Sequence, residues 1–175
     1  LSAAYTYKTG PSIIAVSPGY GPTSGGTSVT ISGTNFVSGA LISFGGASCS
    51  PTSLTAIQIV CTTTAHEAGT VNVVVTNPDT QSSTYASGFI YRDGPILVNI
   101  DPVSGPVSGG TPLALNGSGF ITGATVTVGG AACGGVIFVS ANKLTCQAPS
   151  HAAGPVDVTV TNSDDQFSTL AGSFS

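Results

Sequence analysis

Apolar and polar residues alternate in short runs along the whole chain. In residues 28–32 the apolar positions are Val29 and Ile31, and in residues 112–116 they are Leu113 and Leu115. A period of two places the apolar side chains on one face of a β-strand, and that face is buried. No segment shows a sustained 3.6-residue apolar stripe, so the pattern predicts strands and no helix.

The predicted strands fall into two matching sets. Pro18 and Pro102 each end an early strand, because proline cannot donate a hydrogen bond to a neighbouring strand. The sets are residues 13–17, 28–32, 41–44, 71–77 and 88–91 in the first half of the chain, and residues 97–101, 112–116, 125–128, 156–162 and 172–175 in the second.

The two halves of the chain are copies of one another. Residues 10–36 read GPSIIAVSPGYGPTSGGTSVTISGTNF, and residues 94–120 read GPILVNIDPVSGPVSGGTPLALNGSGF, a shift of 84 positions. About seven short strands in a unit of roughly 85 residues are typical of an immunoglobulin-like sandwich. We therefore predict an all-β chain of two tandem sandwiches in an extended arrangement, at residues 10–93 and 94–175.

Comparison of the copies predicts which face of the strongest strand is buried. The strand reads VNVVVTN in the first half and VDVTVTN in the second, and Asn72 and Asp157 cannot lie in a core. The residues predicted to face the cores are therefore Val71, Val73, Val75, Val156, Val158 and Val160, together with the pairs Ile42/Phe44 and Val126/Val128 of a neighbouring strand.

The small number of basic residues limits the kinds of partner that the chain could bind. Charged residues make up 6% of the chain, and the net charge is −4 with only three basic residues, Lys8, Arg92 and Lys143. Binding of nucleic acid needs clustered Lys and Arg to neutralise phosphates, so we expect no nucleic acid partner. No apolar run approaches the roughly 18 residues of a membrane-spanning helix, so we expect no membrane insertion by this segment.

The repeated positions resemble those of the IPT/TIG domain family. The resemblance rests on Pro18, Gly21, Gly25-Gly26-Thr27, Gly33, Phe36, Gly39-Ala40, Phe44-Gly45-Gly46, Cys49, Cys61, Gly69 and the valine strand, most of which recur in the second copy. It implies an early-set immunoglobulin-like sandwich. It implies no single function, because such modules occur in plexins, transcription factors, bacterial surface proteins and carbohydrate-active enzymes.

The four cysteines form one pair in each copy. Cys49 and Cys61 flank the turn that follows the FGG strand, and Cys133 and Cys146 do so in the second copy. An even count, paired within each small β domain, predicts two intradomain disulfides and an oxidising compartment. Two alternatives remain: a zinc site that adds His66 or His151 at C-x4-H spacing, which lacks a fourth ligand, and free thiols packed as small apolar residues.

The other polar residues are more typical of turns than of catalytic or metal-binding sites. His66-Glu67 and Ser150-His151 precede the valine strand, and a Ser beside a His in sequence lacks the convergent geometry of a nucleophile and its base. The stretches 77–79 (NPD) and 162–165 (NSDD) offer too few oxygens for calcium. Residues 116–118 (NGS) match a glycosylation sequon by pattern only. We predict no catalytic residue, no metal and no cofactor.

Two classes of function fit this sequence. The first is a structural or adhesive segment of a secreted or cell-surface protein, which contacts neighbouring repeats and a protein or glycan at the surface. The second is an ancillary glycan-binding module, for which Tyr20 and Tyr85 are the weak ligand-binding candidates in a chain without Trp. A DNA-binding role is opposed by the charge balance and the cysteines.

The start of the chain resembles the end of the first repeat. Residues 1–18 match residues 85–102 at the shift of 84, so that Tyr5 and Tyr7 stand where Phe89 and Tyr91 stand. Residues 1–9 are therefore predicted to be the closing strand of a preceding repeat. The alternative is a strand that completes a neighbouring chain head to tail and builds a fibre.

Overall fold

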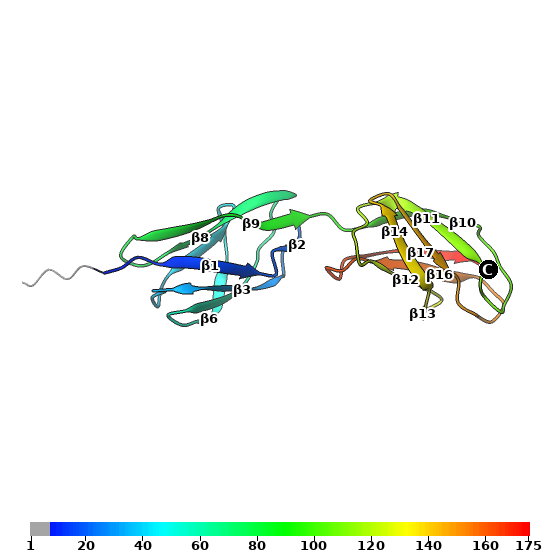
Figure 1. Ribbon diagram of the computed structural model, residues 1–175, viewed down its shortest axis with the longest axis horizontal. Helices are drawn as coiled ribbons and strands as arrows, with labels where there is room; N and C mark the ends of the chain where they lie inside the picture. Colours follow the sequence, from blue (N-terminus) through cyan, green and yellow to red (C-terminus); the bar gives the residue numbers. More distant parts are fainter. Residues whose placement is uncertain (1–7) are drawn as a thin grey trace, which may run out of the picture. The chain divides into compact units, whose positions relative to one another are not determined.

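The computed structural model describes residues 8–175, and all regular structure in that part of the chain is β-strand (Figure 1). The contacts divide it into two units at the bond between Arg92 and Asp93. The prediction of an all-β chain with two tandem sandwiches is confirmed. The closing strand predicted at residues 1–9 lies, apart from Lys8 and Thr9, outside the described residues.

The first domain is a sandwich of two sheets. One sheet has the order β1-β3-β7-β6 and the other β2-β9-β8-β4-β5, and Figure 1 shows β1, β3 and β6 on one side with β8 and β9 on the other. All neighbouring strands are antiparallel except β2 and β9, which are parallel. The strands are β1 (Ser12–Ser17), β2 (Tyr20–Pro22), β3 (Ser28–Thr34), β4 (Leu41–Phe44), β5 (Ala47–Ser48), β6 (Ser50–Leu54), β7 (Gln58–Thr62), β8 (Gly69–Thr76) and β9 (Ser82–Arg92).

The second domain repeats this topology. Its sheets have the orders β10-β11-β15-β14 and β13-β12-β16-β17. In place of a strand equivalent to β2, Val103 and Gly105 exchange backbone hydrogen bonds with Ser175. The strands are β10 (Ile96–Asp101), β11 (Pro112–Ser118), β12 (Thr125–Val128), β13 (Ala131–Ala132), β14 (Gly134–Ser140), β15 (Lys143–Gln147), β16 (Val156–Thr161) and β17 (Phe167–Phe174).

Each domain has its own core between its two sheets. The predicted inward residues are buried: Ile42, Phe44, Val71, Val73, Val75, Val126, Val128, Val158 and Val160, with Val29, Ile31, Leu113 and Leu115. Val156 is only half-buried, because it lines a hollow at one end of the second domain. Asn72 and Asp157 are exposed, as the comparison of the copies predicted.

The last strands of the two domains correspond at a different shift from the 84 positions that relate residues 10–36 to residues 94–120. Ser87 and Gly172 both have a left-handed φ, 52° and 56°. Their N–H groups donate to the Oδ1 atoms of Asn72 and Asp157, both at distances below 3 Å. The equivalence in this region is therefore a shift of 85, which places Phe174 where Phe89 lies. The strand predicted at 172–175 is the end of the longer β17.

Two glycines of the repeated SGGT turn are required for different reasons. Gly25 and Gly109 have φ values of 76° and 74°. A Cβ at these positions would lie 2.5 Å from the carbonyl carbon of Thr64 and 2.6 Å from that of Pro149. Gly26, which also has a positive φ, has open space around its missing Cβ. The first glycine of each pair therefore allows two backbone segments to touch, which explains its presence in both copies.

Candidate functional site

The first cysteine pair is bonded and the second is not. Cys49 and Cys61 form a disulfide with a Cα–Cα distance of 5.7 Å inside the first core. Cys133 and Cys146 are thiols in the structure, which differs from the predicted second disulfide. The hydrogen bond between the two thiols lowers the pKa of Cys133 and, together with burial, raises the pKa of Cys146. Cys133 is therefore the more easily ionised thiol of the pair.

We still expect Cys133 and Cys146 to be bonded in protein secreted through an oxidising route, because the two thiols are already in contact. A loop of this size contributes about 3 kcal/mol to the free energy of unfolding in the chain-entropy estimate. Intact-mass spectrometry after alkylation without reductant should detect no free thiol. Protein in which Cys133 and Cys146 are both alkylated would contradict the prediction, and Cys146→Ser, which must leave Cys133 reactive, is the control.

The two histidines are packing residues. The Nδ1–H groups of His66 and His151 donate to the carbonyl oxygens of Glu67 and Ala152, each at 2.8 Å. The imidazole of His66 also stacks on the ring of Tyr91, with centroids 4.9 Å apart. Within residues 8–175 no group of three His, Cys, Asp or Glu side chains is placed to hold a metal ion.

A buried asparagine in each domain joins two loops. Asn77 accepts a hydrogen bond from the N–H of Val37 and donates one to the carbonyl of Asn35. Asn162 does the same with the N–H of Ile121 and the carbonyl of Gly119. Both side chains are at most 3% exposed. The sequence predicts only turn residues at these positions, because the partners of both side chains lie about 40 positions away.

Removal of either asparagine side chain should destabilise its own domain. Asn162→Ala leaves the N–H of the half-buried Ile121 and the carbonyl of Gly119 without their side-chain partner, so we expect the free energy of unfolding to fall by about 1 to 3 kcal/mol. Urea unfolding followed by circular dichroism measures this change. The matched control is Asn99→Ala, whose side chain is exposed and accepts a hydrogen bond from Asn116. Equal losses in the two variants would contradict the assigned role.

Tyr20 and Tyr85, the two candidate ligand contacts, differ in how much of each ring is exposed to solvent. Tyr85 on β9 is 37% exposed. Tyr20 on β2 is half-buried, and the guanidinium of Arg92 lies 4.2 Å from the centroid of its ring. One face of Tyr20 is thus already used in a cation–π contact. Neither tyrosine recurs in the second domain, where Ser104 and Leu170 stand instead.

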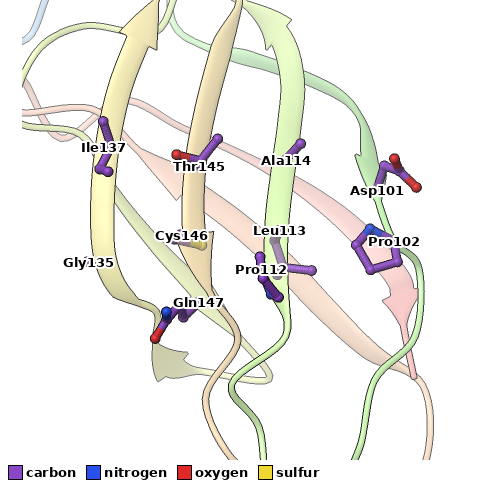
Figure 2. A pocket seen from close by; sticks show the side chains of 10 residues that line it. All are labelled: Asp101, Pro102, Pro112, Leu113, Ala114, Gly135, Ile137, Thr145, Cys146 and Gln147. Atoms are coloured by element: carbon purple, nitrogen blue, oxygen red, sulfur yellow. The ribbon is translucent and has the colours of Figure 1, made fainter.

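The second domain has a broad groove on its sheet β10-β11-β15-β14 (Figure 2). Its volume is about 640 Å³, and it extends from Asp101 and Pro102 to Gly135 and Ile137 on the opposite edge strand. The polar side chains that line it are Asp101, Thr145 and Gln147, and none of the lining residues is aromatic. The groove therefore offers no aromatic platform on which a sugar ring could stack.

The fold and these residues define a class: tandem immunoglobulin-like modules whose recurrent polar groups support the fold. Comparison with protein families matches residues 11–91 and 95–175 to the IPT/TIG domain. The chain belongs to the IPT/TIG family and contains two such domains. In the part of the chain that the structure describes, no helix is long and apolar enough to cross a membrane.

Individual relatives are much longer than this chain. It is 33% identical to human (Homo sapiens) fibrocystin-L over 162 residues, which is 89% of this chain and 4% of that protein. It is 34% identical to mouse (Mus musculus) plexin-A4 over 145 residues, which is 79% of this chain and 8% of that protein. The structure of the plexin A4 full extracellular region matches 99% of this chain and 19% of its own, with a TM-score of 0.56 and 25% identity.

Proposed function

We propose that the chain is a non-catalytic structural segment of an extracellular protein, in which two domains at residues 10–93 and 94–175 space or present a binding region. The observation that carries this proposal is the use of the repeated polar residues. The histidines and the buried asparagines recur in both domains, and in each domain they form hydrogen bonds with backbone groups of that domain. The role of these residues in the fold explains why they recur in both domains, and no ligand is needed to explain it.

An extracellular location is supported by two further observations. The disulfide between Cys49 and Cys61 is buried in the first core, and such bonds persist in oxidising compartments. The solved structure with 25% identity over nearly the whole chain is described as an extracellular region. Neighbouring repeats, and a protein or glycan at the cell surface, are the partners that such a segment would meet.

The strand pairing at the ends of the first domain suits a spacer under tension. The strand β2, which follows the first strand β1, runs parallel to the last residues of β9, and the two are joined by bonds such as Ile90 N–H to Gly19 O and Thr23 N–H to Arg92 O. Tension applied to the start of β2 and the end of β9 loads these bonds in shear. Bonds loaded together resist more force than bonds opened one after another.

The competing function is an ancillary glycan-binding module, favoured only by the exposure of Tyr85. We expect the folded chain to bind no member of a glycan array. The matched pair of variants is Tyr85→Ala and Phe167→Ala, since Phe167 is an exposed aromatic of the second domain at 68%. Glycan binding that Tyr85→Ala abolishes and Phe167→Ala leaves intact would replace the structural proposal with this one.

The proposal also states that the chain is not an enzyme. We expect no turnover of ester, glycoside or peptide substrates, because the Nδ1–H of each histidine, which the acid of a triad would have to accept, donates to a neighbouring backbone carbonyl instead. Turnover that is lost in His66→Ala or His151→Ala, with the fold intact by circular dichroism, would overturn this part of the proposal.

A further inference from the structure

The triplet Asn-Gly-Ser at residues 116–118 takes no part in the function proposed above. Among the asparagines of the chain, only Asn116 is followed two positions later by Ser or Thr, with a residue other than proline between them. This is the acceptor pattern for N-linked glycosylation of secreted proteins. At the shift of 84, residues 32–34 of the first domain read Ser-Gly-Thr. The acceptor asparagine is therefore a property of the second domain alone.

The fold places the side chain of Asn116 on an outer surface, as a bulky glycan requires. Asn116 lies on β11 directly after Leu115, whose side chain is fully buried. Successive side chains of a strand point to opposite faces, so Asn116 points to the outer face of the sheet β10-β11-β15-β14. Its cross-strand neighbours are Asn99 on β10 and Lys143 on β15, and both are exposed.

The carboxamide of Asn116 keeps its own contact when a sugar is attached. Its Nδ2 atom donates a hydrogen bond to the Oδ1 atom of Asn99 at 2.8 Å. A carboxamide nitrogen carries two hydrogens, and an N-linked sugar replaces one of them. The remaining hydrogen still reaches Asn99, so the contact holds the amide and the first sugar above β10 and β11.

We propose that Asn116 carries an N-linked glycan, which covers the outer face of this sheet beside the groove of Figure 2. The proposal rests on the proposed extracellular function, because the transfer takes place on the secretory route. The donor is an oligosaccharide linked to a lipid diphosphate. Nδ2 of Asn116 forms a bond to the anomeric carbon, the bond from that carbon to the diphosphate oxygen breaks, and the lipid diphosphate leaves. Nδ2 gives one proton to a base of the transferase.

The groove beside Asn116 has room for the first sugars. Ala114 lies two positions before Asn116 on the same face of β11, about 7 Å along the strand. It lines the groove, whose volume is about 640 Å³, together with Thr145 on the neighbouring strand. Asp101 and Gln147 offer polar groups to sugar hydroxyls. No aromatic platform is needed, because a covalently attached sugar has a high local concentration and requires little affinity of its own.

The test is secretion of the chain from mammalian cells, followed by intact-mass spectrometry and peptide mapping. We expect one N-linked glycan, attached to Asn116 and removed by peptide N-glycosidase. Ser118→Ala should abolish the glycan although the acceptor asparagine is unchanged, and Ser118→Thr should retain it. Ser32→Asn completes the same pattern at the equivalent position of the first domain, and it should add a second glycan.

The position of the glycan is measured by methyl NMR on the glycosylated chain and on the Ser118→Ala chain. We expect the methyl signals of Ala114 and Thr145 to differ between the two samples. The signals of Thr30 and Val60, which stand at the equivalent positions of the first domain, should agree. Unchanged signals of Ala114 and Thr145 would show that the sugars project into solvent, which would overturn the assignment to this face.

The proposal and the function on which it rests fail in different ways. A chain that is secreted with the disulfide between Cys49 and Cys61 closed, but with Asn116 unmodified, would overturn the proposal and leave the structural function standing. Glycosylated protein that binds a glycan array through Tyr85 would support the modification and overturn the structural function.

Discussion

Val158→Asp should unfold the second domain and leave the first folded. Val158 is fully buried at the centre of β16, between Val128 on β12 and Leu170 on β17. An unpaired carboxylate at this position costs several kcal/mol, which is comparable to the whole free energy of unfolding of a small domain. Differential scanning calorimetry and amide signals assigned to each domain should detect the loss of one domain only.

The control for this prediction is Val74→Asp on the equivalent strand of the first domain. Val74 points away from the core, between Ser43 and Thr84, and is half-buried. We expect a change below about 1 kcal/mol in the free energy of unfolding, as for most surface substitutions. Comparable destabilisation by the two aspartates would mean that the inward and outward faces of these strands are assigned incorrectly.

Gly109→Ala should destabilise the second domain more than the same change at the adjacent Gly110. A Cβ at Gly109 would lie 2.6 Å from backbone atoms of both Pro149 and Ser150. The left-handed φ adds about 1 to 2 kcal/mol for any residue with a Cβ. Displacing the touching backbone adds an overpacking cost of similar size, so we expect a total of about 2 to 5 kcal/mol.

Gly110→Ala separates these two effects. Gly110 has a φ of 84°, and nothing lies within 4 Å of the place where its Cβ would be. Only the conformational cost of about 1 to 2 kcal/mol should then appear in urea unfolding. Equal losses in the two variants would show that Gly109 is required for its backbone angle alone and that the close approach to residues 149 and 150 contributes nothing.

Most of the strands with clear alternation were predicted from the sequence, but the central strands β7 and β15 were missed although they alternate too. The predicted bounds of β4 and β12 agree with the structure, and the ends of β1 and β10 fall at the residues before Pro18 and Pro102. The strand β6 was missed because Ser50–Leu54 is mostly polar and exposed, and it lies at the edge of its sheet. The first half of β9 was missed because it is largely exposed and a bulge separates it from the buried half.

The candidate site was predictable only where its residues are close in sequence. Spacing identified the bond between Cys49 and Cys61. The contacts of Asn77 and Asn162 depend on loops that only the folded chain brings together.

The central claim is that the chain is a folded spacer built of two independent domains. Single-molecule force spectroscopy on the oxidised chain, held by its two ends, tests it most directly. The account predicts two separate unfolding events, each lengthening the chain by roughly 200 to 250 Å for a matched region of 81 residues, with less from the first domain because its disulfide stays closed. A single event for both domains, or smooth extension without any event, would contradict it.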